Sequence, residues 1–259
     1  MPNPSVADGR RLRYKTALIT GASRGIGYAI AKSFAIQGAN LVLSAFNEAG
    51  LVKAKAELDG YGVDISYLAT DISSPDSIEE LFAFAVERHP ELDILVNNAG
   101  IHISKPFTDH GLDDFDRLMK TNVYSVFQLT QQAIRHMQKL GRGKVINVAS
   151  VAGLRGSINS AAYNTSKHAI VGLTRCVALE NAKNGINVNA ICPGIVETDL
   201  IKGVQQRMET QGMPSEEFRE RILAQIPIGR LLQPEEIANI AVFLASSESD
   251  GMSGETISI

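Results

Sequence analysis

The 259-residue sequence contains only two cysteines, Cys176 and Cys192. A disulfide framework is implausible in a chain of this size, and neither cysteine lies at a metal-ligand spacing. We therefore expect a reduced, cytoplasmic protein without a metal site. Cys192 is expected to be a packed residue at the end of a strand rather than a nucleophile.

The sequence also lacks a basic surplus and long apolar runs. Its 25 Lys and Arg residues are balanced by 28 Asp and Glu residues, so neither nucleic acid nor an anionic membrane is expected as a partner. No apolar run approaches the length of a membrane span, and residues 1–13 contain none that suits a signal peptide. We expect residues 1–13, which include three arginines, to form a flexible, solvated arm.

From residue 14 onward, short apolar runs alternate with segments of helical periodicity. This alternation implies right-handed crossovers and a parallel sheet covered by helices on both faces. The sequence predicts an α/β fold, a doubly wound sheet of about seven strands, in one domain over residues 14–259. Expected strands are 16–20, 40–45, 65–69, 93–97, 144–149, 187–191 and 256–259. Expected helices include one that begins after Gly27 and runs to about Gln37, and those over 48–58, 75–88, 112–140 and 161–181.

A glycine-rich turn, Gly21-Ala-Ser-Arg-Gly25-Ile-Gly27, joins the first strand to a helix. Glycines allow a positive φ and a close backbone approach, and a helix N-terminus offers N–H donors to a pyrophosphate. The spacing differs from the common Gly-x-Gly-x-x-Gly fingerprint, so a simple tight connection is the alternative.

The end of the second strand bears on the choice of nucleotide. An acid there binds the adenosine ribose 2′-hydroxyl, whereas a base favours a 2′-phosphate. The residues present are Ala45, Phe46 and Asn47, so neither signal is found. Arg24 is either a ligand of a 2′-phosphate or an exposed turn arginine.

Several polar or glycine-containing segments follow strands, where ligands bind in parallel sheets. They are the glycine turn, Asp71, residues 97–100, Ser150 and residues 192–194. This coincidence predicts a single site. Asp71 either contacts the adenine end of a nucleotide or caps the next turn.

Tyr163 and Lys167 lie four residues apart on a predicted helix and so share one face. Ser150 precedes Tyr163 by thirteen residues. A tyrosine has an ordinary pKa of about 10, and a nearby ammonium favours its phenolate. The trio suggests proton transfer beside a hydride carrier; a surface hydroxyl and a solvated lysine are the alternative.

The ordered set of motifs resembles the classical short-chain dehydrogenase/reductase family. It comprises Thr20-Gly-Ala-Ser-Arg-Gly-Ile-Gly27, Asn97-Asn-Ala-Gly100, Asn122, Ser150, Tyr163-x-x-x-Lys167 and Pro193-Gly-Ile-Val-Glu-Thr198. The resemblance implies a single Rossmann-like domain, NADP or NAD as cofactor, and a homotetramer or homodimer. The family's Asp-Gly-Gly segment near the C-terminus is not present. Arg24 favours NADP and Phe46 resembles NAD-using relatives; we lean towards NADP.

The resemblance also implies roles for individual residues. Tyr163 would carry the proton, Lys167 would support it and hold the nicotinamide ribose, Ser150 would bind the substrate oxygen, and Asn122 would support a water. The implied cofactor-binding residues are Gly21, Ser23, Arg24, Gly25, Ile26, Gly27, Phe46, Asp71, Ile72, Asn98, Ala99, Gly100, Tyr163, Lys167, Pro193, Gly194, Ile195 and Thr198.

Residues 101–107, 151–162 and 195–223 are expected to shape the substrate pocket, with a lid at about 195–224. The pocket candidates are His102, Ala152, Arg155 and Asn159. They fit a small secondary alcohol, namely a diol, a polyol or a hydroxy acid. Local segments resemble 3-hydroxybutyrate dehydrogenases, whose carboxylate-binding positions correspond here to His102, Ala152 and Ser160.

A 3-oxoacyl-(acyl-carrier-protein) reductase is the alternative. Such enzymes dock their acidic carrier with arginines near the pocket mouth, and the corresponding positions here are Gly141 and Asn184. A non-catalytic nucleotide-binding regulator is a remoter alternative, because it would be expected to lose Tyr163 or Lys167.

Overall fold

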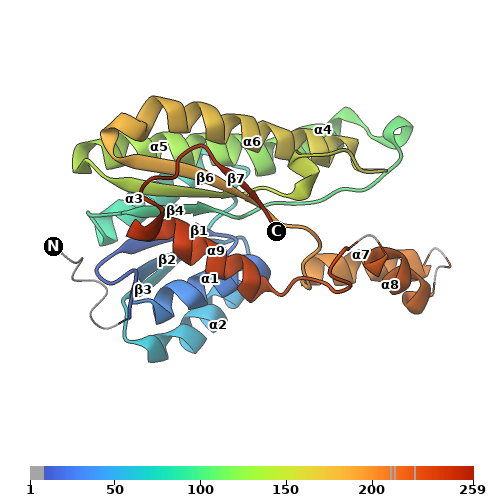
Figure 1. Ribbon diagram of the computed structural model, residues 1–259, viewed down its shortest axis with the longest axis horizontal. Helices are drawn as coiled ribbons and strands as arrows, with labels where there is room; N and C mark the ends of the chain where they lie inside the picture. The colour runs from blue at the N-terminus through green and yellow to red at the C-terminus, as the bar shows by residue number, and fades with distance from the viewer. Residues whose placement is uncertain (1–8, 211, 213, 225) are drawn as a thin grey trace.

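The computed structural model describes residues 9–259 other than 211, 213 and 225. Within these residues the chain forms one seven-stranded parallel sheet of order β3-β2-β1-β4-β5-β6-β7 (Figure 1). This confirms the predicted doubly wound α/β fold. The strands are β1 Thr16–Thr20, β2 Asn40–Ala45, β3 Ile65–Ala69, β4 Ile94–Asn97, β5 Gly143–Val148, β6 Ile186–Cys192 and β7 Thr256–Ser258.

Helices cover both faces of the sheet (Figure 1). One apolar core joins the sheet to α1 (Gly25–Ile36), α2 (Glu48–Leu58) and α9 (Pro234–Ala245). A second core joins the opposite face to α3 (Pro75–Arg88), α5 (Ser125–Leu140) and α6 (Ala161–Asn181). Successive strand residues point to opposite faces, so Leu41 and Leu43 enter the first core while Val42 enters the second.

Two further helices, α7 (Asp199–Thr210) and α8 (Ser215–Leu223), lie to one side of these layers (Figure 1). They occupy the segment for which a lid was predicted. Pro214 directly precedes α8, and Gly203 lies within α7. Lid motion stays a prediction.

The helix predicted over residues 112–140 contains an irregular turn. α4 (Leu112–Met119) is followed by a π-helical turn over Lys120–Tyr124 and then by α5. A π turn inserts one residue into the helical repeat and rotates the side chains that follow. Asn122 lies in this turn.

The predicted N-terminal arm needs correction. Residues 1–8 lie outside the described residues. Leu12, however, is fully buried in the core that contains α1, and its N–H donates to the Gln37 carbonyl at 3.0 Å. Full burial of a leucine side chain is favourable by about 1.5–3 kcal/mol, and the burial of Leu12 therefore holds this segment against α1. The packed domain therefore begins before residue 14.

The C-terminal strand forms without the family's Asp-Gly-Gly segment. β7 pairs with β6, and the carbonyl of Ile259 accepts the N–H of Gly194 at 2.8 Å. The end of the chain thus supports the loop that was expected to flank the nicotinamide.

Candidate active site

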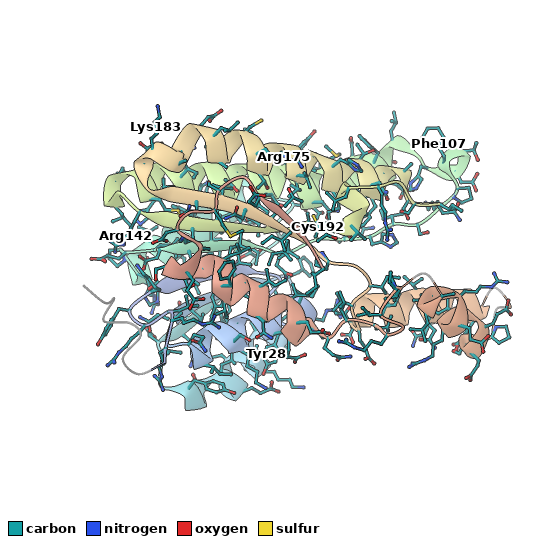
Figure 2. All side chains as sticks on the ribbon, in the orientation of Figure 1. Tyr28, Phe107, Arg142, Arg175, Lys183 and Cys192 are labelled. Atoms are coloured by element: carbon teal, nitrogen blue, oxygen red, sulfur yellow. The ribbon has the colours of Figure 1, made fainter. Side chains whose placement is uncertain are left out.

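The carboxyl ends of the central strands bring the predicted site residues to one edge of the sheet. In Figure 2, Phe107, from the loop after β4, and Arg142, which precedes β5, mark opposite ends of the molecule. Cys192, the last residue of β6, lies between them. The loops that follow β1, β4, β5 and β6 all start at the Phe107 side, as a parallel sheet requires.

The glycine turn is held in place by the loop after β4. Gly21 and Gly25 adopt left-handed backbone angles, with φ of 66° and 57°. A Cβ on Gly27 would lie 2.3 Å from the Gly21 carbonyl oxygen, so a side chain cannot be accommodated there. The amide nitrogen of Asn98 donates to the carbonyls of Thr20 at 2.9 Å and Gly21 at 3.3 Å.

Thr20 completes this brace and was missed as a site residue from the sequence. Its buried hydroxyl accepts the backbone N–H groups of Asn98 and Ala99, both at 3.0 Å. Thr20 thus contacts Asn98 twice, because its hydroxyl accepts the backbone N–H of Asn98 and its carbonyl accepts the side-chain amide. The motif contained Thr20, but nothing in its spacing indicated that its hydroxyl joins two loops.

The turn fits the pyrophosphate of a dinucleotide. Arg24 is the extended N-cap of α1, and no side chain among the described residues caps this helix start. The first N–H groups of α1 are thus open to an anion beside a backbone that has no room for side chains. Gly100 provides a second close approach: its Cβ would lie 3.2 Å from Asn122 Oδ1 and 3.7 Å from Lys167 Nζ.

Tyr163 and Lys167 lie together on α6. The ammonium of Lys167 is 5.8 Å from the centre of the Tyr163 ring and donates to the Val148 carbonyl at 3.1 Å. Burial lowers the pKa of Lys167 to about 8. Burial raises the pKa of Tyr163, while its hydrogen bond with the Ser150 side chain opposes that rise.

Asn122 connects the loop after β4 to α6. Its Oδ1 accepts the N–H of Ile101 at 2.9 Å, and its Nδ2 donates to the Ile101 carbonyl at 2.9 Å and to Ser166 Oγ at 3.1 Å. Ser166 in turn donates to the Tyr163 carbonyl at 2.7 Å. Ser166 was not singled out from the sequence, and its contacts show that the π turn supports the Tyr163 helix directly.

Ser150 ends the loop segment that follows β5. Its Oγ accepts the N–H of Ala152 at 3.1 Å, which fixes the side chain at the start of a short 3-10 turn. The next residue, Val151, donates its N–H to the Pro193 carbonyl at 3.0 Å. Cys192 is fully buried beside this contact, and burial raises the pKa of its thiol. It is a packed strand-end residue, as predicted.

The predicted substrate residues divide into two groups. The His102 ring meets the Tyr163 ring edge to face, with centroids 4.6 Å apart, and its Nε2 lies 3.4 Å from Ser160 Oγ. Ala152 is buried, and its N–H donates to Ser150 Oγ. Arg155 and Asn159 are exposed; Asn159 has a φ of 59°, and its carbonyl accepts the N–H of Lys105 at 2.9 Å.

On the expected adenosine side, the side chains are less enclosed. Phe46 is 80% exposed. Asp71 Oδ1 accepts both the N–H of Ser73 at 2.9 Å and its hydroxyl at 2.7 Å, and these bonds lower the pKa of Asp71. The turn-capping alternative for Asp71 is therefore present in the structure. Ile72 packs partly buried against the second core.

The start of α7 touches the glycine turn. Arg24 Nη1 lies 3.5 Å from Asp199 Oδ2, and both side chains are largely exposed. A Cβ on Gly25 would lie 3.4 Å from the Thr198 methyl group. Arg24 was expected to be either a phosphate ligand or a solvated residue, and the structure adds an ion pair that neither expectation included.

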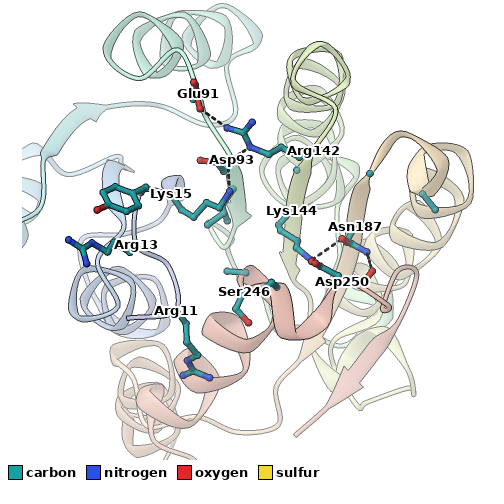
Figure 3. Close-up of a pocket in the computed structure, with 17 residues that line it drawn as sticks. Arg11, Arg13, Lys15, Glu91, Asp93, Arg142, Lys144, Asn187, Ser246 and Asp250 are labelled. Carbon is teal, nitrogen blue, oxygen red and sulfur yellow. Dashed lines mark hydrogen bonds and ion pairs between the residues drawn. The ribbon is translucent and has the colours of Figure 1, made fainter. Parts of the chain in front are cut away.

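A cavity of about 710 Å³ lies at the opposite edge of the sheet (Figure 3). Its cations are paired with acids: Lys15 and Arg142 each lie 2.9 Å from Asp93, and Lys144 lies 2.7 Å from Asp250. Three helices, α5, α6 and α9, end beside it, and cations stabilise the negative ends of helix dipoles. None of the predicted site residues lines this cavity.

Comparisons with known proteins agree with this geometry. A family model described as Enoyl-(Acyl carrier protein) reductase matches residues 21–259. D-beta-hydroxybutyrate dehydrogenase of Cupriavidus necator is 40% identical over 245 residues, covering 94% of this chain and 95% of the relative. The 3-oxoacyl-(acyl-carrier-protein) reductase FabG of Vibrio cholerae is 38% identical over 248 residues, covering 96% of both.

Solved structures extend the comparison to bound molecules. A 7 alpha-hydroxysteroid dehydrogenase complexed with NADH and 7-oxo glycochenodeoxycholic acid is 37% identical, with a TM-score of 0.90 over 100% of this chain and 96% of that one. A variant actinorhodin polyketide ketoreductase with NADPH is 35% identical, with a TM-score of 0.91 over 95% of both chains.

Proposed function

The chain belongs to the classical short-chain dehydrogenase/reductase family, and we propose that it interconverts a small secondary alcohol and its ketone with NADP or NAD. The substrate would be a diol, a polyol or a hydroxy acid. The observation that carries this proposal is the convergence of Tyr163, Lys167 and Ser150 beside a glycine turn that is open to a pyrophosphate.

The nicotinamide accepts or supplies the hydride when bound. The residues of the chain handle the proton. Ser150 binds the carbinol or carbonyl oxygen, and the Tyr163 hydroxyl takes the alcohol proton during oxidation or returns it during reduction. Lys167, held by the Val148 carbonyl, stabilises the phenolate, while Asn122 and Ser166 fix the position of the helix.

The proposed dinucleotide site would bind its ligand through backbone N–H groups and through the charge of Lys167. The open N–H groups at the start of α1 bind the pyrophosphate, and Gly100 admits the ribose near Lys167. When bound, a positively charged nicotinamide ring would add to the charge of Lys167 in favouring the phenolate form of Tyr163. Lowering a tyrosine pKa by about three units corresponds to about 4 kcal/mol of differential stabilisation.

His102 and Ser160 support a substrate with a second polar group. The His102 ring packs against the Tyr163 ring and its Nε2 lies 3.4 Å from Ser160 Oγ, so these two side chains can hydrogen-bond an oxygen close to the reacting carbon. This arrangement fits a diol or a hydroxy acid better than a monofunctional alcohol. We also propose that the protein forms a homotetramer or homodimer and is cytoplasmic. As a separate finding, the helices that the structure describes include no candidate membrane span.

Reduction of a 3-oxoacyl thioester is the second candidate, favoured by the relative in Vibrio cholerae. Two positions that correspond to the carrier-docking arginines of such reductases hold Gly141 and Asn184 in this chain. In the structure, however, a Cβ on Gly185 would lie 2.6 Å from the Gly141 carbonyl, and Gly185 lines the cavity at the edge opposite Tyr163. Those positions therefore lie away from Tyr163 in the same chain, and their lack of arginine does not count against this candidate.

A substrate panel separates the candidates. We expect the protein to reduce NAD or NADP with 2,3-butanediol, small polyols or 3-hydroxybutyrate, and to do so faster than with 2-butanol. Turnover confined to 3-oxoacyl thioesters would establish the second candidate. Inactivity in both series, with dinucleotide binding intact, would favour the non-catalytic alternative.

A further inference from the structure

We propose that Asp199 is a determinant of nucleotide choice, because it competes with the ribose 2′-phosphate of NADP for the guanidinium of Arg24. The inference rests on the proposed dinucleotide site. It starts from the ion pair between Arg24 Nη1 and Asp199 Oδ2, 3.5 Å apart, which joins the glycine turn to the first residue of α7.

The position of Arg24 relative to β2 supports its access to the ribose. A Cβ on Gly50 would lie 3.0 Å from Ser23 Cβ, and Asn47 lies beside the same contact. The glycine turn therefore packs against the start of α2, immediately beyond the end of β2. In a doubly wound sheet this is where the adenosine ribose binds, and the residue after Ser23 borders it.

The charges at this border make Arg24 important. Ala45 ends β2 and is followed by Phe46 and Asn47, so none of these residues carries a charge toward the ribose. Arg24 is the cation that the glycine turn offers. A 2′-phosphate is a stronger partner for a guanidinium than one carboxylate, because it carries more charge and more acceptor oxygens.

The pair is readily exchanged. The Arg24 side chain is 76% exposed and that of Asp199 is 59% exposed, so neither group is desolvated in the pair. Exposed ion pairs change an equilibrium by about five-fold at most. NADP binding would have to displace Asp199, whereas NAD has no 2′-phosphate and leaves the pair intact. Asp199 thus weakens NADP binding relative to NAD.

The test is a double-mutant cycle read as dissociation constants for NADPH and NADH, measured by titration without substrate. Asp199→Asn should tighten NADPH binding by about two- to five-fold and leave NADH binding unchanged. In the Arg24→Ala background, Asp199→Asn should have no effect on either nucleotide, because the competing partner is gone.

Glu216→Gln is the matched control. Glu216 is also an acid in the first turn of a helix in the 195–224 segment, so the variant removes the same charge and the same dipole contact from α8. It should not change the NADPH to NADH ratio.

Two outcomes would overturn the proposal: an equal effect of Asp199→Asn on both nucleotides, or an effect that persists without Arg24. The first would mean that Asp199 acts on the shared part of the dinucleotide, and the second that it repels the phosphate directly. If the unaltered protein bound neither nucleotide, the proposed function itself would fail, which is a distinguishable result.

Discussion

Burial raises the pKa of Tyr163 and lowers the pKa of Lys167, and so favours the uncharged form of each side chain. A buried ammonium loses its proton more readily, and a buried phenol holds its proton more firmly. At neutral pH the protein alone therefore keeps Tyr163 as an acid and Lys167 as a cation. This pair of states suits proton donation to a ketone.

These shifts predict a pH dependence for the reduction reaction. The value of kcat/KM reports groups on the free enzyme. Lys167 has a pKa of about 8, so its charge, which in the proposed mechanism stabilises the phenolate formed during reduction, is lost as the pH rises through that value. We expect kcat/KM for ketone reduction to be level near neutrality and to fall above about pH 8, approaching ten-fold per pH unit. A level profile up to pH 10 would show that Lys167 stays charged or is not required.

Some residue-level interpretations could be reached from the sequence and others could not. The Tyr163–Lys167 spacing fixes their common helix face, so their proximity was predictable. Asp71 could equally face a nucleotide or a turn, because both uses need a carboxylate after a strand. The Arg24–Asp199 pair joins residues 175 positions apart, and no local pattern indicates it.

At the scale of elements, the glycine turn is the most constrained connection in the site. Gly27→Ala would place a Cβ 2.3 Å from the Gly21 carbonyl and 2.5 Å from Asn98 Nδ2. Because overpacking of this kind costs about 1–3 kcal/mol, we expect reduced stability in urea unfolding together with weaker dinucleotide binding.

Gly172→Ala provides the matched control for this substitution. Gly172 lies within α6, and a Cβ there would meet nothing within 4 Å. Replacing an exposed glycine inside a helix by alanine should stabilise the protein by about 0.5–1 kcal/mol and leave binding unchanged. Equal behaviour of the two variants would contradict the close packing assigned to Gly27.

The elements themselves were largely predictable, since apolar runs and glycine or proline boundaries mark them. The helix over 75–88 has the predicted bounds, with Ser74 as N-cap and Pro75 at its first position. The π turn at Lys120–Tyr124 was not predicted. It depends on hydrogen bonds from Asn122 to the loop after β4 and to α6, which are tertiary contacts rather than a local preference.

At the scale of the whole molecule, two histidines have lowered pKa values: His136 on α5 and His89 at the end of α3. His136 meets Phe82 edge to face with centroids 6.1 Å apart, and His89 caps the end of α3. Burial lowers the pKa of both imidazoles. Each therefore favours the neutral form in the folded state, whereas in the unfolded chain its pKa is about 6.5.

The stability of the fold should consequently fall on mild acidification. The unfolded chain binds these protons first, so the stabilisation is complete above about pH 6.5 and decreases as the pH falls towards the folded-state values. Carboxylates that are paired with cations contribute stability that is lost only at lower pH. For example, the hydrogen bond from Arg230 lowers the pKa of Glu236 to about 2. Urea unfolding between pH 5 and 7.5 should show the decrease.

Substitutions at His89 and His136 test whether these two imidazoles cause the decrease in stability. The double substitution His89→Gln and His136→Gln should flatten the profile in this window. His168→Gln, at an exposed position on α6, should leave it unchanged. A slope that persists in the double variant would place the proton-linked groups elsewhere.

The most direct test of the account is the Tyr163→Phe variant, measured for both turnover and dinucleotide binding. The substitution keeps the half-buried ring and its contact with His102 while removing the hydroxyl that is proposed to exchange the proton. The account predicts that kcat falls by about 10²–10⁴-fold, the range ascribed to a general acid or base, with dissociation constants for NADH and NADPH unchanged. Turnover within a few-fold of the unaltered protein would contradict it, because the proton would then pass through another group.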